Sequence, residues 1–305
     1  MSTMREIRER IGSISDTMKI TNAMYLISST KLRKARKSLQ ETEPYFVALQ
    51  MQIERILRHL PQDFEHPYLD TRVKISDENR RRAFIVVSAD KGLAGAYNHN
   101  VLKLAEREMN ARKGGTNLLF VIGESGRQYF QAKHAPIQEQ FHYTAQNPTL
   151  HRSRGIVERM MDHYESKEVD EVYIIFTRMV NSMQMNAEIR QLLPLYTLND
   201  RMIVGAGETA GDVPLEQFEL RPSPEAVIEN LIPNYLTGFI YGALVESFCA
   251  EQNSRMMAMD AANKNGAKMK SELTIQYNRA RQAQITQEIT EVVAGAKAQA
   301  LREDR

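Results

Sequence analysis

Three glycine-containing motifs are the first candidates for chemistry, because they could bind a phosphate group or present a nucleophile. Residues 205–210 (GAGETA) fit the GxGxxG/A pattern of dinucleotide-binding loops, but Pro214 follows soon after, where the phosphate-binding helix should be forming. Residues 123–126 (GESG) lack the glycine spacing of a nucleophile elbow and fit a strand-to-helix turn. Residues 90–95 (DKGLAG) follow an expected strand, where α/β proteins bind ligands, but lack the GKS/T ending of a nucleotide loop. None of the three predicts a working phosphate or catalytic site.

The metal-binding and nucleophilic side chains are also scattered. The seven histidines show no HxxxH spacing, and the single cysteine, Cys249, allows no CxxC pair. One cysteine excludes an internal disulfide, fits a reducing compartment and is expected to be a buried small residue. No pair of carboxylates has the placement of a general acid and base. The sequence therefore predicts no catalytic residues, no cofactor and no metal.

A dense cluster of cations is the strongest local charge signal. It comprises five basic residues within seven positions: Lys31, Arg33, Lys34, Arg36 and Lys37. Residues 1–40 hold nine Lys or Arg against three Asp or Glu. Such a cluster fits a solvated helix face, a nucleic-acid site or a contact with an acidic protein surface. No aromatic residues alternate with the cations, which disfavours a nucleic-acid site that depends on base stacking.

The N-terminal segment that carries this cluster has the pattern of a long helix. Residues 1–43 contain one glycine and no proline, and apolar or small residues recur in alternating steps of four and three from Ile7 to Leu39. This 3.5-residue repeat predicts one strand of a left-handed coiled coil. Pro44 is expected to kink or interrupt the helix, and Pro61 to end it.

A second apolar face on the same segment does not belong to the coiled-coil seam. It consists of Ile20, Met24 and Ile27. Two explanations remain open: the face packs further onto the partner helix, or another protein covers it.

The middle of the chain alternates between strands and helices. Short apolar runs predict strands, separated by helical patterns; the expected strands are 83–88, 117–122 and 172–177, and the expected helices 97–112, 124–133 and 149–166. This order predicts an α/β domain with a largely parallel sheet. Residues 201–222, rich in Gly and Pro, read as a connector with one possible strand at 216–220.

The C-terminal segment predicts a second long helix. Beyond Pro224, the segment as far as residue 301 contains one proline, Pro233, near its start, and the 78 residues 224–301 would span roughly 117 Å as a helix. The expected seam residues step by three and four: Met259, Ala262, Gly266, Met269, Leu273, Gln276, Ala280 and Ala283. Beyond Ala283 the apolar stripe shifts to Ile285, Ile289, Val292 and Ala296. The two terminal helices are expected to pair antiparallel, with dimerisation through either helix as the competing arrangement.

Composition limits the class of protein. The chain has 305 residues, 42% of them hydrophobic, and a net charge of +2, so it can fold around a core, and its overall charge does not indicate a nucleic-acid binder. The most apolar stretch, residues 235–250, is interrupted by Glu246 and falls short of the about 18 apolar residues that cross a bilayer. The charged N-terminus resembles neither a signal nor a transit peptide. These features favour a cytoplasmic bacterial protein that could reach a membrane only through partners.

Three sequence blocks together resemble the γ subunit family of F-type ATP synthases. Residues 285–298 (ITQEITEVVAGAKA) fit the family's C-terminal signature at every position. Residues 5–34 resemble its opening helix, and residues 88–95 (SADKGLAG) its S-D-x-G-L-x-G turn. The resemblance implies an α/β fold class in which the N- and C-terminal helices form a long antiparallel coiled coil beside a central Rossmann-like domain. The implied segments are 1–60 and 223–305 for the helices, 75–200 for the central domain and 201–222 for the connector.

The resemblance also implies a role and partners. It implies a non-catalytic rotor that turns inside a hexameric head of α and β subunits while its base rides on the c-ring with the ε subunit. Ion-driven rotation would then make and release ATP, and the same subunit would regulate ATPase activity and proton flow. The expected location is the cytoplasmic side of the bacterial inner membrane, on its periphery. No nucleic-acid partner is expected, although a coiled-coil nucleic-acid-binding protein using residues 31–37 is the alternative. A nucleotide-dependent α/β enzyme would need a phosphate loop that the sequence does not supply.

Alignment with the family assigns contacts to individual residues. The implied contacts with the α/β head are Lys19, Met24, Lys31, Arg33, Lys34, Arg255, Arg281, Gln282, Thr286 and Glu288. The implied c-ring and ε foot is Phe218, Leu220 and Arg221. In many members an acid precedes the foot proline, whereas this chain has Arg221.

Overall fold

A computed structural model describes residues 4–61, 64–70, 72, 74–112, 115–195 and 220–303, with side chains as far as residue 296. The chain divides into two compact units. One comprises Met1–Ile27 with Met256–Arg305, and the other Ser28–Arg255. Residues 216–219 of the expected strand, including Phe218, and the glycine motif at 205–210 lie outside the described residues.

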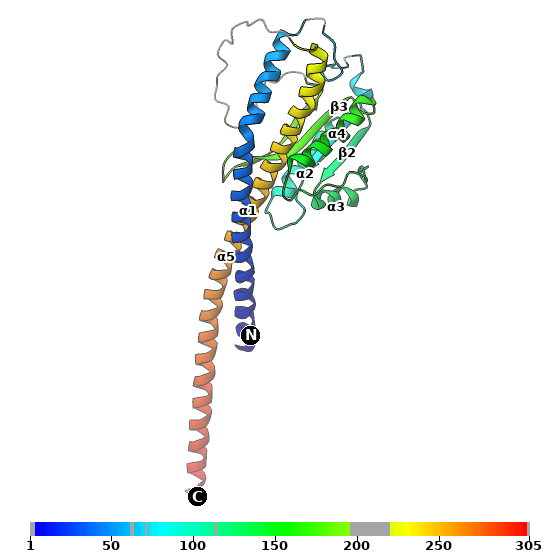
Figure 1. Cartoon of the computed structure of the whole chain (residues 1–305). Helices are drawn as coiled ribbons and strands as arrows, with labels where there is room; N and C mark the ends of the chain where they lie inside the picture. Colours follow the sequence, from blue (N-terminus) through cyan, green and yellow to red (C-terminus); the bar gives the residue numbers. More distant parts are fainter. Residues whose placement is uncertain are drawn as a thin grey trace. The chain divides into compact units, whose positions relative to one another are not determined.

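Two long helices, α1 (Met4–His59) and α5 (Pro224–Glu303), confirm the helical predictions for both ends of the chain (Figure 1). Pro44 does not interrupt α1, contrary to the sequence expectation. A proline removes one backbone hydrogen bond, and packing beyond it can offset that loss. Phe46 supplies such packing, since it is buried against Gly238 of α5. Pro61 follows the end of the helix, as predicted.

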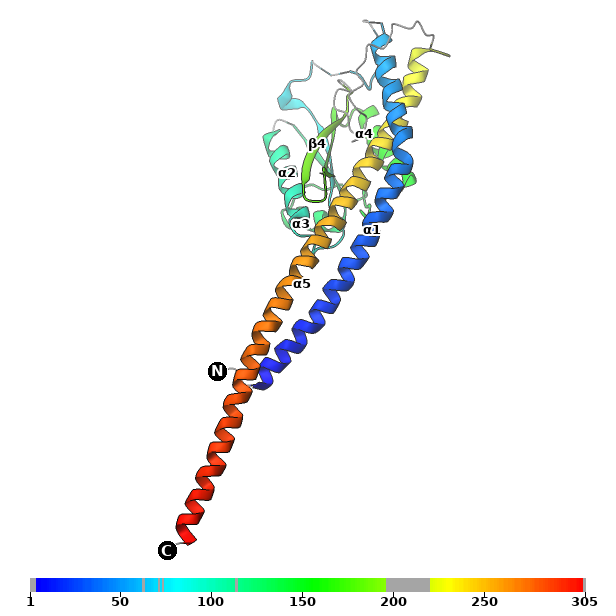
Figure 2. The ribbon, with the colours of Figure 1, turned by 90° about the vertical axis from the view of Figure 1, so that its left-hand side faces the viewer.

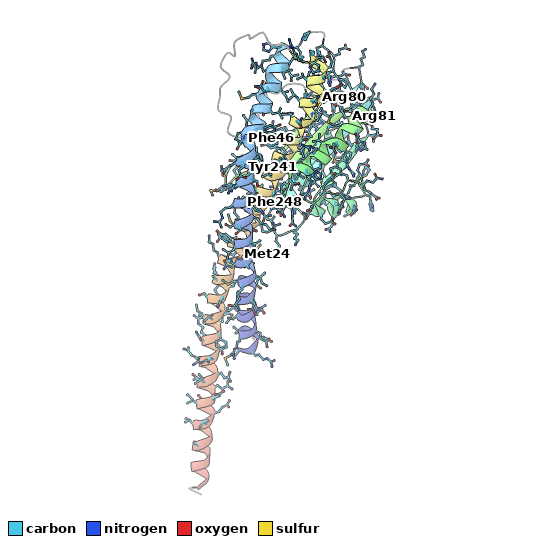
Figure 3. All side chains as sticks on the ribbon, viewed as in Figure 1. Met24, Phe46, Arg80, Arg81, Tyr241 and Phe248 are labelled. Atoms are coloured by element: carbon cyan, nitrogen blue, oxygen red, sulfur yellow. The ribbon has the colours of Figure 1, made fainter. Side chains whose placement is uncertain are left out.

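The two helices run antiparallel in each unit (Figure 2). In the unit of the chain ends, Lys270 Nζ donates to Ser15 Oγ at 2.9 Å, and Thr21 hydrogen-bonds to Asn263. In the larger unit, the rings of Phe46 and Tyr241 lie 6.3 Å apart between the facing helices (Figure 3). The antiparallel pairing is therefore confirmed in both units.

The seam on α1 consists of the predicted residues, whereas the seam on α5 is shifted. The α1 positions from Ile7 to Leu39 are buried or half-buried. On α5, Met259, Gly266, Leu273 and Ala280 face the partner, but Ala262, Met269, Gln276 and Ala283 are exposed. The half-buried positions that replace them on the seam are Asn263 and Tyr277. The sequence prediction missed these two seam positions because it looked for apolar or small residues, whereas Asn263 and Tyr277 carry polar groups.

The central sheet has four strands in the order β2-β1-β3-β4. The strands are β1 (Arg82–Val87), β2 (Asn117–Ile122), β3 (Glu171–Met179) and β4 (Met185–Leu193). β1 pairs in parallel with both β2 and β3, and β4 adds antiparallel at the edge. The largely parallel sheet is confirmed, but β4 was not predicted. Its alternating charged residues, including Glu188 and Arg190, hide an edge strand from a search for apolar runs.

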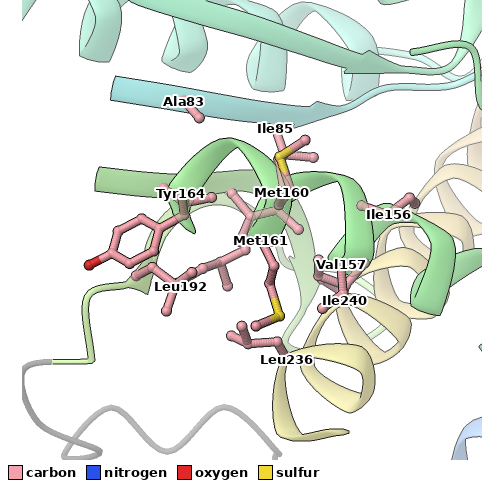
Figure 4. Close-up of a cluster of buried hydrophobic side chains, with 14 of the residues drawn as sticks. Ala83, Ile85, Ile156, Val157, Met160, Met161, Tyr164, Leu192, Leu236 and Ile240 are labelled. Atoms are coloured by element: carbon pink, nitrogen blue, oxygen red, sulfur yellow. The ribbon is translucent and has the colours of Figure 1, made fainter. Parts of the chain in front are cut away.

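Helices cover both faces of this sheet. The predicted helices are confirmed as α2 (Tyr97–Ala111), α3 (Glu124–Ala132) and α4 (Leu150–Glu165), with a 3-10 turn at Asp77–Asn79. All six residues of β1 are buried, with Phe84 and Val86 packed on one side against α2 and α3. On the other side Ala83 and Ile85 pack against α4 and α5 (Figure 4). The α/β domain thus uses the C-terminal helix as part of its own core.

An ion-pair network stabilises the amino-terminal edge of β1 and β3. Asp170 is buried and receives Arg72 Nη1 at 2.6 Å and Arg81 Nε at 3.3 Å. The neighbouring Glu171 receives Arg82 Nε at 2.9 Å and pairs with Arg80. Burial raises the pKa of Asp170, but the hydrogen bonds from Arg81 and Arg72 outweigh it and hold the pKa below its usual value. Buried carboxylates are tolerated here because each has two cationic partners.

Candidate functional site

The apolar face predicted on α1 is exposed to solvent in this chain. Ile20 is 62% and Ile27 55% exposed, and Met24 is half-buried beside them (Figure 3). The nearby Lys19 is exposed, and its Nζ lies 2.9 Å from Asp16 Oδ1. Since α5 leaves Ile20 and Ile27 uncovered, packing onto the partner helix does not account for this face. It remains available to another protein.

The basic cluster on α1 is largely exposed, and two of its members contact other side chains of the chain. Arg33 and Lys34 are exposed, whereas Lys31 is half-buried. Arg36 donates to the Met179 sulfur at 3.5 Å, and Lys37 Nζ lies 3.9 Å from Glu41 Oε1. Arg36 and Lys37 are nevertheless exposed, so four of the five cations present their charge to solvent.

Arg255 is buried, unlike the other cations of the predicted site. It is 8% exposed, and its Nη1 lies 2.6 Å from Glu251 Oε1. Its Nη2 donates to the carbonyls of Gly92 at 3.1 Å and Lys91 at 3.2 Å. Burial raises the pKa of Glu251, and the charge and hydrogen bond of Arg255 act against that rise. Arg255 therefore clamps the turn at residues 90–95 onto α5.

The same turn is anchored at its first residue, Asp90. The Asp90 carboxylate accepts hydrogen bonds from the backbone N–H groups of Glu124 at 3.2 Å and of Ala145 and Gln146 at 3.1 Å. Leu93 takes a left-handed backbone conformation with φ of 62° and is 65% exposed at the tip. The sequence singled out residues 90–95 for their place after a buried strand, but it assigned no role to Asp90 itself.

The crevice in which α/β proteins bind ligands is filled by α5. β1 has β2 on one side and β3 on the other, so the switch point lies at the carboxyl ends of β1 and β3. There the Thr177 backbone N–H donates to Ser247 Oγ of α5 at 3.0 Å, and Tyr97 packs with Ala250. Burial and the nearby Glu251 raise the pKa of Tyr97, so its phenol stays neutral. The crevice serves packing, and the turn at residues 90–95 is not a phosphate loop.

The motif at residues 123–126 is a strand-to-helix turn, as predicted. Gly123 has φ of 93°, a conformation that suits glycine. A side chain at Gly126 would collide with Ser88, whose hydroxyl accepts the Gly126 N–H at 2.9 Å. The glycines therefore allow α3 to start close against β1.

The far end of α5 carries the remaining predicted head contacts. Arg281, Gln282, Thr286 and Glu288 are all exposed. Thr286 Oγ1 donates to the Gln282 carbonyl at 2.9 Å, and Glu288 accepts from Gln284 at 2.9 Å. The apolar residues between them are exposed as well: Ile285 by 43%, Ile289 by 59% and Val292 by 72%. The shifted stripe predicted from the sequence is therefore an open apolar surface in this chain.

At the predicted foot, the described residues are Leu220 and Arg221. Leu220 packs against the core cluster beneath the sheet, and Arg221 is exposed. Cys249 is buried, as predicted, at 3% exposure. Within the described ranges, no group of three His, Cys, Asp or Glu side chains could hold a metal ion. No described helix has the long apolar run that a membrane crossing requires.

Comparison with known proteins decides the family. The ATP synthase family profile matches residues 3–299. The ATP synthase gamma chain of Ruminiclostridium cellulolyticum is 44% identical over 297 residues, which cover 97% of this chain and 99% of the relative. This chain belongs to the ATP synthase gamma chain family. A gamma chain of Acetobacterium woodii, named as sodium ion specific, is 35% identical and covers 97% of this chain and 98% of its own length.

A chain in a solved ATP synthase assembly shares the fold. A chain of the Euglena gracilis mitochondrial ATP synthase, solved with OSCP, F1 and c-ring, superposes with a TM-score of 0.61 at 15% identity. The match covers 97% of this chain and 94% of that chain. The gamma chain is the non-catalytic central stalk subunit of the synthase and part of its peripheral F1 sector, so the predicted rotor identity is confirmed. The comparisons give no support to the nucleic-acid alternative.

Proposed function

We propose that this chain is the shaft of a bacterial F-type ATP synthase, turning within a head of α and β subunits while its base rides on the c-ring with ε. In this proposal residues 1–60 and 223–305 form the shaft, residues 75–200 the base domain and residues 201–222 the connector. Rotation of the c-ring by ion flow turns the shaft. The shaft's asymmetry then drives each β subunit in turn through binding, synthesis and release of ATP.

The observation that carries this proposal is the length of α5 beyond its pairing with α1. Lys270 lies opposite Ser15, so the same register brings α5 to Arg281 where α1 begins at Met4. From Arg281 to Ala296 every described side chain is exposed. A lone helix with exposed Ile and Val is an unfavourable surface in water unless another protein encloses it.

The enclosing partner must permit rotation. Ile285, Ile289 and Val292 provide apolar contact, which has no preferred direction and breaks few hydrogen bonds when one surface slides past another. We infer that the head surrounds this stripe as a bearing. Met24, Ile20 and Ile27 on α1 provide a second such surface.

Polar residues beside the apolar surfaces supply the contacts that must be made and broken during each turn. Arg281 lies one helical turn from Ile285, on the same side of α5 as the stripe. Gln282, Thr286 and Glu288 already make hydrogen bonds within the helix that contacts with the head can replace. In this proposal, Lys31, Arg33 and Lys34 face acidic loops of the β subunits, and Lys19 lies at the same interface.

Arg255 acts differently in this proposal, because it is buried. It holds the turn at residues 90–95 against α5 and so presents Leu93 at the surface. Any effect of Arg255 on coupling then passes through the position of this turn.

The proposed base reaches the membrane only through partners. Leu220 and Arg221, with Phe218, form the foot that meets the c-ring and ε on the cytoplasmic side of the plasma membrane. Because Arg221 carries a positive charge, its partner on the ring or on ε is expected to be acidic.

The chain purified from its native membranes should bring with it a hexameric ATPase in one copy per chain.

A pair of substitutions on α5 tests the coupling role. Arg281→Ala and Arg281→Glu should reduce ATP synthesis by the reconstituted complex, with the charge reversal more severe. Arg279→Ala is the matched control, since residue 279 is also an exposed arginine but lies on the opposite side of the helix. Full synthesis in both Arg281 variants, or an equal loss in the Arg279 control, would contradict the proposal.

A further inference from the structure

A cavity of about 250 Å³ lies between α1 and α5 in the larger unit. Leu39 and Phe46 of α1, Phe239 and Cys249 of α5, and Met179 of β3 give it a largely apolar lining. Gly242 leaves it open, since a Cβ at that position would meet no atom within 4 Å. The hollow is therefore part of the packing of the two helices.

An acidic side chain, Glu246, lines this hollow one turn beyond Gly242. The Met179 backbone N–H hydrogen-bonds to its carboxylate. The second carboxylate oxygen, Oε2, is buried and accepts no hydrogen bond from any residue that the structure describes. A buried carboxylate with an unsatisfied oxygen is costly in its charged form and much less so as the neutral acid.

The charged groups around Glu246 do not fully balance the negative charge of its carboxylate. Arg178 of β3 attracts it, but the Arg178 Nε also lies 3.0 Å from Glu188 Oε1 of β4. Glu188 is in turn paired with Arg190 at 3.1 Å and repels Glu246. Glu43 of α1, which lines the same cavity, repels it as well.

Two further groups face the cavity. Arg36 of α1 donates a hydrogen bond to the Met179 sulfur. Burial raises the pKa of the Cys249 thiol to about 12, although the positive charge of Arg36 opposes this rise, so the thiol is neutral. Burial is likewise the main reason that the pKa of Glu246 rises, to about 7, with Arg178 and the Met179 N–H opposing it and Glu188 and Glu43 adding to it.

We propose that Glu246 is a reversible proton-binding site in the α1–α5 interface, and that gain or loss of its proton changes how firmly the two helices pack. The neutral acid places an uncharged group in the cavity and does not repel Glu43. The carboxylate repels Glu43 across the interface and draws water to its unpaired oxygen. The two helices are then held less firmly at this level.

The direction of the pH effect follows from proton binding. The ordinary pKa of 4.5 applies to the unfolded chain, and the folded chain holds its proton to about pH 7. Stability from this site is complete below the unfolded pKa and is lost as pH rises through the folded pKa. From pH 6 to pH 8 the folding equilibrium constant should therefore fall about tenfold because of Glu246.

The test compares urea unfolding of the full-length chain at pH 6 and pH 8. Glu246→Gln, a neutral side chain of the same shape, should abolish this part of the pH dependence. Because it reproduces the neutral acid at every pH, it should be about 300-fold more favourably folded than the parent chain at pH 8 and about 30-fold at pH 6. Glu43→Gln should move the transition to lower pH, because it removes a repelling charge. Glu272→Gln, an exposed acid on the same helix, is the matched control and should change neither.

Infrared difference spectra provide a measurement that does not depend on unfolding. The parent chain should show a carboxylic acid carbonyl band that titrates near neutral pH, and Glu246→Gln should lack it. A Glu246→Gln variant with the parent's pH dependence and the same band would overturn the proposal. An unchanged transition in Glu43→Gln would also contradict it, since the charge cluster would then not set the proton affinity.

Discussion

Two glycines one turn apart on α5 should respond in opposite directions to the same substitution. Gly238 and Gly242 both lie inside the helix, where alanine is favoured over glycine by about 1 kcal/mol. At Gly242 a Cβ meets nothing within 4 Å, whereas at Gly238 it would lie 2.0 Å from Phe46 Cδ1 and 2.3 Å from Cε1. Gly242→Ala should therefore stabilise the chain, and Gly238→Ala should force the Phe46 ring to move.

The magnitudes follow from the helix gain and the packing loss. Gly242→Ala should gain about 1 kcal/mol of unfolding free energy, because the helix preference is unopposed. At Gly238 the same gain is offset by overpacking and by lost burial of Phe46, which together cost about 2–4 kcal/mol. Gly238→Ala should therefore be less stable than the parent by about 1–3 kcal/mol.

Urea denaturation of the purified full-length chain, followed by circular dichroism, measures both effects. A third variant, Phe46→Leu combined with Gly238→Ala, should recover part of the loss, because a smaller side chain leaves room for the new methyl group. Equal shifts of the midpoint in Gly238→Ala and Gly242→Ala would refute the packing of α1 on α5 at Phe46.

Two further predictions concern the buried charges. Arg255→Ala should cost about 3–5 kcal/mol of stability, because it leaves the buried Glu251 carboxylate without its cationic partner. Arg255→Lys should cost less, because it keeps a positive charge there. A loss below about 1 kcal/mol in the same urea assay would show that the clamp is unimportant. Asp170→Asn should destabilise the chain at pH 7, since Asp170 bonds Arg72 and Arg81. Its folded pKa is depressed, so its contribution is present above the unfolded value of about 4 and is lost as pH falls through the folded pKa. The difference in unfolding free energy between Asp170→Asn and the parent should accordingly become smaller as the pH falls. A difference that does not change with pH would contradict this assignment.

The helices and the parallel strands could be predicted because their signals are local. The heptad steps from Ile7 to Leu39 and the apolar runs at β1 and β2 each reflect burial of a repeating set of side chains. Pro44 misled because a proline's local penalty can be outweighed by packing, which here involves Phe46 and Gly238. The edge strand β4 was missed because it is mostly half-buried and carries the charged pair Glu188 and Arg190, of which Glu188 also pairs with Arg178 of β3, so it has no continuous apolar run.

The candidate site was only partly predictable for the same reason. The apolar surfaces at Ile20 and Ile289 could be found because they do not fit a two-helix seam. By contrast, Arg255 looked like the other cations in the sequence, and only the fold reveals that it is buried against Glu251 and the Gly92 carbonyl. Glu246 likewise has no distinguishing feature in the sequence, because the groups that surround it come from α1, β3, β4 and α5.

Rotation of the chain within its complex tests the central claim most directly. The α/β head would be fixed to a surface and a bead attached through a cysteine introduced at Arg107, which is exposed on α2, while the native Cys249 is buried. With ATP the bead should turn stepwise in one direction, and Arg281→Glu should weaken or stall the rotation more than Arg279→Ala does. Sustained ATP hydrolysis with a stationary bead in the parent complex would contradict the account of this chain as a rotating shaft.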